Sequence, residues 1–550
     1  MRPQGCEPET LRALAEMPFL DRVDLVAVTG RSKGAVYEAV DRLEGGSLVT
    51  AVPYATDILP QTLRYYLSAA GMRHLAEQEN TSLDELVRDH PIAARWRRIL
   101  MERMDALAAI YRLAAAIASV AYPVRFHWYR GIPLDAAVEL PGGRTVGIIR
   151  QGHTADRSPF SRRLWRMRQG HLPGVVLALM ADDVRLRHAR RSLMGADAPF
   201  YLAREREAVA ASPDDPVWIP PAVNAQIELR SILDRIEEGS TLPEEDGLRH
   251  VSLPAELAVE GPGWNIPDHL LPATLRAAEK RALDLIFDWP WIALTDLAGL
   301  MNVSVPRASQ IVAPLEGFRL VFRPTDAARR LTLTDRALAL LARRDRTSLA
   351  MAKSRWSASP LFPGTPLDWE NVTGARSRQL LRNLQHSAAV HVFLAAMTVQ
   401  ADLMEWEVVQ VDPPRRASRH FRYEEGQRSV NPDAFGVLRK GETVLPFFLE
   451  WERRAVRPST MSARLAPYLR YYSSHRPTDD HGTRPSVLVV FDDETAHTHF
   501  LRVAREEMQA KGVDVPLWIS HASAIEKLGP LGRAWRTPNE WESPKALLPQ

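Results

Sequence analysis

The sequence predicts a mixed α/β protein in which one arrangement of helices and strands is written twice. Three observations lead to this expectation. The same succession of helix-type and strand-type periodicities begins near Leu11 and again near Lys280. In both passages a serine directly precedes the third helical segment. Each half later contains two apolar strands joined by a glycine-containing turn. We therefore expect four domains in tandem, at 1–88, 89–262, 263–368 and 369–550.

The composition is that of a folded protein and not of a polycation. The 550 residues are 45% hydrophobic and 25% charged, with a formal net charge of +3. Of the 70 basic residues, 7 are lysine and the other 63 are arginine. The arginine guanidinium can bind phosphate through two hydrogen bonds at once. Cys6 is the single cysteine, which excludes an internal disulfide and a cysteine-based zinc site.

With no apolar leader at its start, the chain is expected to be cytoplasmic. We expect the alanine-rich stretch 106–122, interrupted by Arg112, to be a buried helix and not a membrane span.

The repeated passage has the element order of a winged helix-turn-helix. Two helices, a short turn, a third helix, a hairpin and a closing helix are predicted over 11–75 and over 280–343. The third helices begin after Ser32 and Ser304 and end in "LEGGSLV" and "LEGFRLV". Such a domain places its third helix in the major groove of double-stranded DNA, although winged helices also serve as protein-binding modules. The candidate DNA contacts are Arg31, Ser32, Lys33 and Tyr37 in the first copy, and Ser304, Arg307, Ser309 and Gln310 in the second.

The hairpin of the second half carries three acidic residues in a pattern that favours metal chemistry. Glu450 and Glu452 are two apart on a strand and therefore share one face. A turn at Gly441–Glu442 would place Asp433 directly opposite Glu450, with Cβ atoms about 5 Å apart. Three carboxylates would then converge, and Mg²⁺ prefers oxygen ligands of this kind. The stretch "VLPFFL" before the glutamates is apolar, as in a central strand, although an acidic solvated face is the plainer interpretation.

These residues resemble the motif of the PD-(D/E)xK nuclease superfamily, with Pro432-Asp433 on one strand and Glu450-x-Glu452 on the next. The resemblance implies a catalytic set of Asp433, Glu450 and Glu452, with Asp433 and Glu450 holding Mg²⁺ or Mn²⁺. It also implies that Arg464 and Tyr468, on one face of the next helix, hold DNA or the acidic cluster. The chain departs from the motif where a lysine is usual, because Glu452 stands there. Arg453 cannot act as a base, because a guanidinium keeps its proton.

The corresponding hairpin of the first half lacks the acidic pair. We predict a two-residue turn at Gly142–Gly143, which places Asp135 opposite Arg150. The positions that match Glu450 and Glu452 would then be Arg150 and Gly152. The first copy is therefore expected to be inactive, serving as a scaffold or as a DNA clamp through the basic helix that follows, with Arg162, Arg163, Arg166 and Arg168.

The second half as a whole, about 278–535, resembles the replication-relaxation family of mobile-element proteins. The resemblance rests on "LQHSAAVHVFLAA", "NPDAFGVL" and "FFLEWERR…RLAPYLRYY", and His386 matches a histidine that the family places before the hairpin. It implies a plasmid or mobile-element protein that acts in the initiation of replication or transfer, with double-stranded DNA as its partner. A metal-dependent nickase or endonuclease is one expected activity. A non-catalytic regulator or origin-binding protein is the alternative. Other transfer or replication proteins and a second copy of the chain remain open as partners.

A tyrosine relaxase is a rival that the sequence argues against. "AHTHF" offers His497 and His499, with Tyr468, Tyr471 and Tyr472 upstream. The surrounding residues have the period of an amphipathic helix, on which positions two apart do not face together. The chain also has no glycine-rich phosphate loop of the Walker type.

Overall fold

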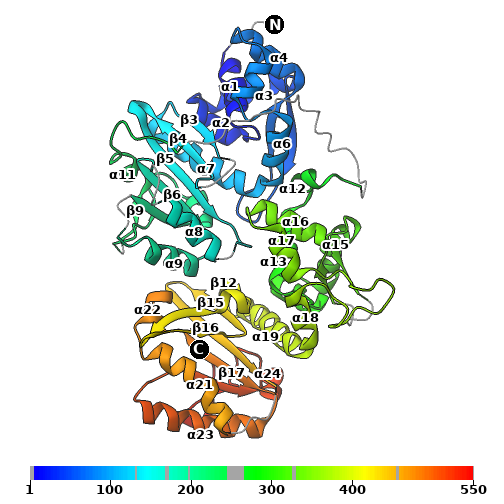
Figure 1. Ribbon diagram of the computed structural model, residues 1–550, viewed down its shortest axis with the longest axis vertical. Coiled ribbons are helices and arrows are strands. Elements are labelled where there is room, and N and C mark those ends of the chain that lie inside the picture. The colour runs from blue at the N-terminus through cyan, green and yellow to red at the C-terminus, as the bar shows by residue number, and fades with distance from the viewer. Residues whose placement is uncertain are drawn as a thin grey trace. The chain divides into compact units, whose positions relative to one another are not determined.

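The computed structural model describes residues 5–129, 133–155, 157–167, 172–195, 199–223, 225–243, 265–324, 330–453 and 458–548. The chain forms two compact units (Figure 1). The first unit contains 1–280 together with 338–352, and the second contains 281–337 with 353–550. With 49% helix and 21% strand the protein has the expected mixed α/β class. The segment 338–352 therefore belongs to the first unit, although it follows part of the second along the chain.

The first unit begins with three helices and a hairpin. Its early elements are α1 (Glu7–Glu16), α2 (Arg22–Thr29), α3 (Lys33–Gly45), β1 (Val49–Tyr54), β2 (Thr62–Leu67) and α4 (Ala69–Gln78). Ser32 caps α3 as predicted, accepting a hydrogen bond from the amide of Ala35. Gly30, with φ of 63°, ends α2 in the left-handed conformation that a tight turn between helices requires. The order predicted for this passage is therefore observed.

Replacing Gly71 by alanine is expected to destabilise this part of the first unit by about 1–3 kcal/mol. Gly71 lies in α4, and a Cβ atom there would come within 1.9 Å of the carbonyl oxygen of Leu48. The backbone would have to move, since a carbonyl group cannot rotate away as a side chain does. Hydrogen exchange at the α4 amides measures the change. The control is Gly34→Ala in α3, where a Cβ would meet nothing within 4 Å. Equal protection in the two variants would contradict the close approach.

A five-stranded sheet forms the rest of the first unit. The helices before it are α5 (Leu83–Asp89), α6 (Ala94–Glu102) and α7 (Met104–Ala121). The strands, in spatial order, are β3 (Arg125–Trp128), β4 (Ala136–Leu140), β5 (Arg144–Gln151), β6 (Val175–Met180) and β7 (Phe200–Arg204). The first three are antiparallel, and β5, β6 and β7 are parallel.

Helices cover both faces of this sheet (Figure 1). α8 (Arg157–Met167) and α9 (Asp183–Leu193) pack on one face through Phe160, Leu164 and Leu186. α7 packs on the other, with α10 (Glu205–Ala210) and α11 (Leu229–Leu233). The smaller elements of this region are β8 (Pro216–Trp218), β9 (Ile227–Glu228), α12 (Leu271–Thr274), and the 3-10 turns Pro141–Gly143 and Asp268–Leu270.

Among the described residues, α7 alone is long and apolar enough to cross a membrane. Two-thirds of it, 67%, is buried in the unit, as the sequence predicts for a core helix.

The second unit repeats the helix and hairpin order. The chain passes through α13 (Ala277–Asp288), α14 (Leu294–Met301), α15 (Val305–Gly317), β10 (Val321–Phe322), β11 (Thr332–Leu333) and α16 (Asp335–Arg344). Ser304 caps α15 as predicted, and Asn302 ends α14 with φ of 55°. The helices α17 (Leu349–Trp356), α18 (Ala375–Arg382) and α19 (Leu384–Leu403) then lead to the second sheet.

The second sheet has seven strands. Their spatial order is β12 (Glu407–Asp412), β15 (Ala434–Lys440), β16 (Thr443–Glu452), β17 (Ser486–Phe491), β18 (Leu517–His521), β19 (Trp535–Thr537) and β20 (Glu540–Lys545). Between β12 and β15 lie α20 (Pro414–Ala417) and a hairpin of β13 (Arg419–Tyr423) and β14 (Gly426–Val430). The remaining helices are α21 (Pro458–Tyr472), α22 (Arg476–His481), α23 (Glu494–Lys511) and α24 (Ala522–Leu528). α23 begins after Asp493, so the segment with His497 and His499 is helical, as predicted.

The two sheets share one plan over five strands. In each, three antiparallel strands are followed by two parallel crossovers. Asp135 and Asp433 occupy the same backbone position. The amide of Asp135 donates to the carbonyl of Ile148 (2.9 Å), and the amide of Asp433 donates to the carbonyl of Leu449 (2.9 Å). The two aspartates thus make equivalent backbone hydrogen bonds, each in its own sheet.

The register predicted for the first hairpin is wrong by one residue. Leu140 pairs with Arg144, so the loop has three residues, Pro141–Gly143, and not the two predicted. A one-residue slip moves every side chain to the other face of a strand. Asp135 therefore lies opposite Ile149 and not Arg150, and the residues that match Glu450 and Glu452 are Ile149 and Gln151. For the second hairpin the predicted register is correct, because Lys440 pairs with Thr443 across Gly441–Glu442.

Candidate functional site

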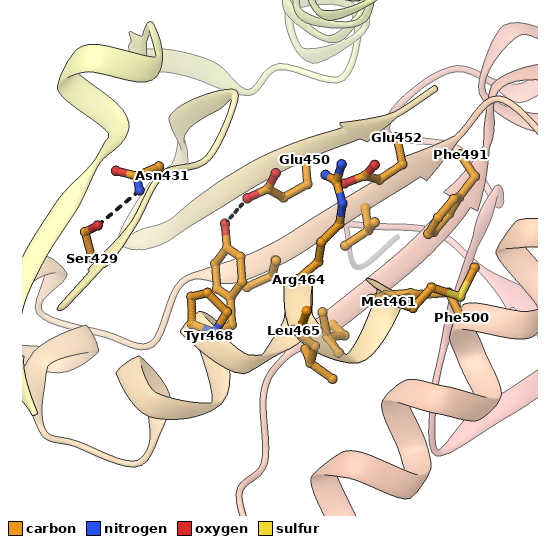
Figure 2. Close-up of a pocket in the computed structure, with 15 residues that line it drawn as sticks. Ser429, Asn431, Glu450, Glu452, Met461, Arg464, Leu465, Tyr468, Phe491 and Phe500 are labelled. Carbon is orange, nitrogen blue, oxygen red and sulfur yellow. Dashed lines mark hydrogen bonds and ion pairs between the residues drawn. The ribbon is translucent and has the colours of Figure 1, made fainter. Parts of the chain in front are cut away.

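Two of the three predicted acidic residues, Glu450 and Glu452, line a pocket between the second sheet and helix α21. The pocket has a volume of about 290 Å³, and its polar lining comprises Ser429, Asn431, Glu450, Glu452, Arg464 and Tyr468. Strand alternation sends Glu450 and Glu452 to the face that α21 covers, as Figure 2 shows. The intervening Trp451 packs on the opposite face against Phe393 of α19. β16 therefore positions both glutamates through its period of two.

Asp433 lies at the start of β15 and is held from two directions. Its Oδ2 accepts a hydrogen bond from the amide of Trp451 (2.8 Å), and its Oδ1 lies 2.9 Å from His386 Nε2 on α19. The hydrogen bond to the Asp433 carboxylate raises the pKa of His386, because it favours the imidazolium form. The side chain of Asp433 is 22% exposed, which leaves this carboxylate open to a ligand.

Glu450 is a half-buried carboxylate that forms no ion pair with any side chain in the described ranges. Tyr468 on α21 donates a hydrogen bond to its Oε1 (2.6 Å), a contact that Figure 2 marks. Burial raises the pKa of Glu450 to about 8, and the nearby charge of Asp433 acts in the same direction, against the smaller effects of the Tyr468 hydroxyl and the Arg464 charge. At neutral pH the isolated pocket thus favours a protonated Glu450, and a bound cation would reverse that preference.

Glu452 is buried and forms an ion pair with Arg464, whose side chain is 54% exposed. Figure 2 shows the arginine rising from α21 toward the two glutamates. The sequence predicts that Arg464 and Tyr468 share a face of their helix, and the structure gives each its own partner, Glu452 and Glu450 respectively. That one-to-one pairing depends on how α21 lies over β16, which the helical period alone does not specify.

The three carboxylates do not form one metal-type cluster. In the part of the chain that the structure describes, no group of three or more His, Cys, Asp or Glu side chains could hold a metal ion. Glu452 is instead paired with Arg464. What remains together is the pair of Asp433 and Glu450 on adjacent strands. Mg²⁺ is often held by one or two carboxylates, with water and phosphate oxygens completing its shell. The pair fits that description.

The matching place in the first unit has different chemistry. Ile149, in the position of Glu450, packs in the apolar core with Leu164 and Met167 of α8. Asp135 pairs with Arg163 (2.8 Å) and with Arg346. These two guanidiniums hold the pKa of the Asp135 carboxyl well below its usual range, against the effect of burial. Arg163 therefore points into the unit and is not part of an exposed clamp, and Arg168 lies outside the described residues.

A buried ion-pair cluster beside it was missed by sequence reasoning. Arg150 pairs with Glu205 (2.6 Å) and with Asp345 (3.0 Å), and Asp345 also accepts hydrogen bonds from the amide and hydroxyl of Thr154. Asp345 follows α16, nearly 200 residues after Arg150. The only signal in the sequence was the unusual run "RRDR" at the end of that helix.

The candidate DNA contacts of α3 and α15 are on exposed surface. Ser32, Lys33, Ser304, Arg307 and Gln310 are exposed, and Tyr37 and Ser309 are half-buried. Arg31 forms an ion pair with Glu9 (2.6 Å), and Arg307 donates to Gln310 (3.1 Å). The Lys33 ammonium lies 5.5 Å from the centre of the Tyr37 ring. These side chains are therefore available to a ligand at the surface of their own helix.

Comparison with known proteins adds one finding. Residues 321–487 match the family model described as Replication-relaxation. Comparison with curated proteins and with solved structures gives no match. The matched segment contains the polar pocket residues Glu450, Glu452, Arg464 and Tyr468, together with Asp433 and its partner His386. This segment, which is less than a third of the chain, is thus similar to the replication-relaxation family.

Proposed function

We propose that the second unit is a metal-dependent DNA nickase or endonuclease, acting in the replication or transfer of a plasmid or mobile element. The match of residues 321–487 to the replication-relaxation family supports such a role. The observation that carries the catalytic part is Glu450, a half-buried carboxylate beside the carboxylate of Asp433, with no cation paired to it among the described side chains. Ionisation of a buried carboxyl is costly unless a cation offsets it, so this site is suited to a cationic ligand.

Asp433 and Glu450 are the residues that would hold Mg²⁺ or Mn²⁺. When bound, such an ion lowers the pKa of a coordinated water and offsets the charge of a phosphate. His386 fixes the orientation of Asp433, and Tyr468 fixes that of Glu450. Each of these two side chains acts through a carboxylate and is a positioning residue.

Arg464 gives the pocket a positive charge at the position where the nuclease motif usually has lysine. Glu452 replaces that lysine and holds the guanidinium of Arg464 at the same corner of the pocket. A guanidinium can bind phosphate oxygens and stabilise charge that develops on them. Glu452 therefore serves as the residue that positions Arg464, and the base for the attacking water comes from elsewhere in the site.

The helices α3 and α15 are the elements that would enter the major groove, as the third helices of two winged helix-turn-helix domains. Three observations support this assignment and the tandem duplication behind it: the repeated element order, the serine caps, and the shared plan of the two sheets. In this arrangement the first sheet domain is a non-catalytic copy, since Ile149 replaces the glutamate.

The direct test is nicking of supercoiled plasmid DNA, preferably one that carries the element's own origin, with Mg²⁺ or Mn²⁺ added after chelation. The wild-type chain is compared with Asp433→Ala, Glu450→Ala and a matched control, Glu442→Ala, at the exposed tip of the same hairpin. We expect nicking by the wild type and the control, and a loss of about 10²-fold or more in both site variants.

Two results would contradict the proposal. Metal-dependent nicking that survives in Asp433→Ala and Glu450→Ala would place the activity elsewhere. Binding of the plasmid without nicking by the wild type would favour the alternative, a non-catalytic regulator or origin-binding protein. The Glu452–Arg464 ion pair is the observation that favours this alternative, because it engages one of the three acidic groups internally.

A further inference from the structure

The outer face of helix α8 in the first unit presents a tryptophan between two arginines. Trp165 is 57% exposed, which is unusual for so large an aromatic side chain. Arg162 and Arg166 are also exposed, and their spacing of three and four residues puts all three side chains on one side of the helix. The opposite side of α8, with Phe160, Leu164 and Met167, packs into the apolar core. The helix is therefore held in place by one face, and its other face is open.

The neighbouring helix α9 extends this face with further positive charge. Among the described side chains of α8, of α9 and of its capping residue Asp182, five surface arginines stand against two aspartates. Arg163 and Arg185 are not counted, because Arg163 points inward to Asp135 and Arg185 is buried. Both aspartates have a partner on α9, since Asp182 pairs with Arg185 (2.7 Å) and Asp183 with Arg187 (2.9 Å). Burial, and to a smaller extent the charge of Arg187, lower the pKa of Arg190. The surface formed by α8 and α9 thus has an excess of positive charge that its own acids do not balance.

We infer that this α8–α9 surface binds single-stranded nucleic acid, with a base stacked on the ring of Trp165 and the flanking arginines contacting phosphates. A cationic surface with an exposed aromatic ring matches the two components of such a strand, which are an anionic backbone and uncovered base faces. Duplex DNA offers an anionic backbone but no uncovered base faces, because each base is stacked between neighbouring base pairs. A protein partner would be expected to meet an apolar surround, and the residues beside Trp165 are cations.

This inference does not depend on the proposed nuclease, because Trp165 and the carboxylate pocket belong to different units. It agrees with the nuclease proposal in one respect, since nicking and strand displacement create single-stranded DNA. The test is made in the presence of EDTA, so that loss of binding and loss of nicking are separate results.

The experiment measures the binding of a fluorescent oligothymidine to the full chain by anisotropy. Trp165→Ala is compared with Trp165→Phe and with Trp541→Ala, which removes a tryptophan of similar exposure, 45%, on the second unit. Loss of one stacked base costs about 1–3 kcal/mol, so Trp165→Ala should weaken binding by about 5-fold to 150-fold. Phenylalanine should restore most of the affinity, because it keeps a ring, and Trp541→Ala should bind as the wild type does. Circular dichroism checks that each variant folds.

A second readout locates the binding face directly. Crosslinking with an iododeoxyuridine oligonucleotide should label the peptide that contains Trp165, and the label should disappear in Trp165→Ala. The double variant Arg162→Ala/Arg166→Ala should reduce the slope of log affinity against log salt by about 0.7 for each phosphate that these arginines neutralise. Unchanged oligothymidine affinity in Trp165→Ala, or an equal loss on duplex of the same length, would overturn the inference. The inference would also be overturned if an acidic protein bound at this face and did not change the binding of oligothymidine.

Discussion

Replacing Glu450 by glutamine is expected to abolish metal-dependent nicking and at the same time to stabilise the second unit at alkaline pH. Glutamine keeps the size of the side chain and one acceptor for the Tyr468 hydroxyl. It removes the negative charge that a divalent cation needs, so the nicking rate should fall by about 10²-fold or more. If Glu450 is retained for function at a cost to the stability of the fold, its replacement should lower activity and raise stability.

The stability effect has a definite sign. Burial raises the pKa of Glu450 to about 8 in the folded protein, whereas a glutamate in an unfolded chain titrates near about 4.3. Between these values the folded state holds a proton that the unfolded state has lost. The stability contributed by Glu450 is therefore fully present below the lower value and is lost as the pH rises through about 8. The slope is at most about 1.4 kcal/mol per pH unit.

The measurement is the free energy of unfolding of the second unit in EDTA at pH 6 and pH 9, from hydrogen exchange in β16. The wild type should lose more stability than Glu450→Gln between the two pH values. Tyr468→Phe serves as a second variant, because removing the donor to Glu450 should steepen the pH dependence without removing the carboxylate. Parallel pH profiles for the wild type and the glutamine variant would show that Glu450 is ionised in the folded protein and would refute the prediction.

Replacing Asp345 by alanine is expected to destabilise the first unit by about 3–5 kcal/mol, the cost of leaving buried charges without their partner. The Asp345 side chain is completely buried and pairs with Arg150 and Arg344. These arginines hold the pKa of its carboxyl well below the usual range. Its removal leaves the Arg150 guanidinium with Glu205 alone in a buried setting.

Hydrogen exchange of the β5 amides measures this loss, and exchange faster by about 100-fold or more is expected for a change of about 3 kcal/mol. The matched control is Asp214→Ala. It breaks an ion pair with Arg230 in which both side chains are about half or more exposed, 66% and 49%. Such an exposed pair contributes little to stability. If both variants exchanged alike, the cluster around Asp345 would not stabilise the unit beyond a surface ion pair.

The comparison of the two hairpins shows how far local rules reach. In the second hairpin, Gly441 and Glu442 form a turn of the predicted length, and the strand period then places Asp433 opposite Glu450 without further information. In the first hairpin, Pro141 joins the turn, and one additional residue exchanges the two faces of the strand. The assignment of Arg150 and Gly152 to the positions of Glu450 and Glu452 was wrong for this reason alone, and the absence of an acidic pair is the same with Ile149 and Gln151.

The serine caps, the helix and strand order, and the positions of Asp433, Glu450 and Glu452 on one hairpin were determined by the sequence itself. They depend on neighbours a few residues away, whose periods and turn residues can be seen directly in the chain. The partners of these side chains were decided only by the tertiary structure: His386 for Asp433, Tyr468 for Glu450, Arg464 for Glu452, and Asp345 for Arg150. Each pairing depends on how one element packs on another, and packing is set by the summed burial of many side chains. For that reason an acidic triad in the sequence became a carboxylate pair and a separate ion pair in the folded protein.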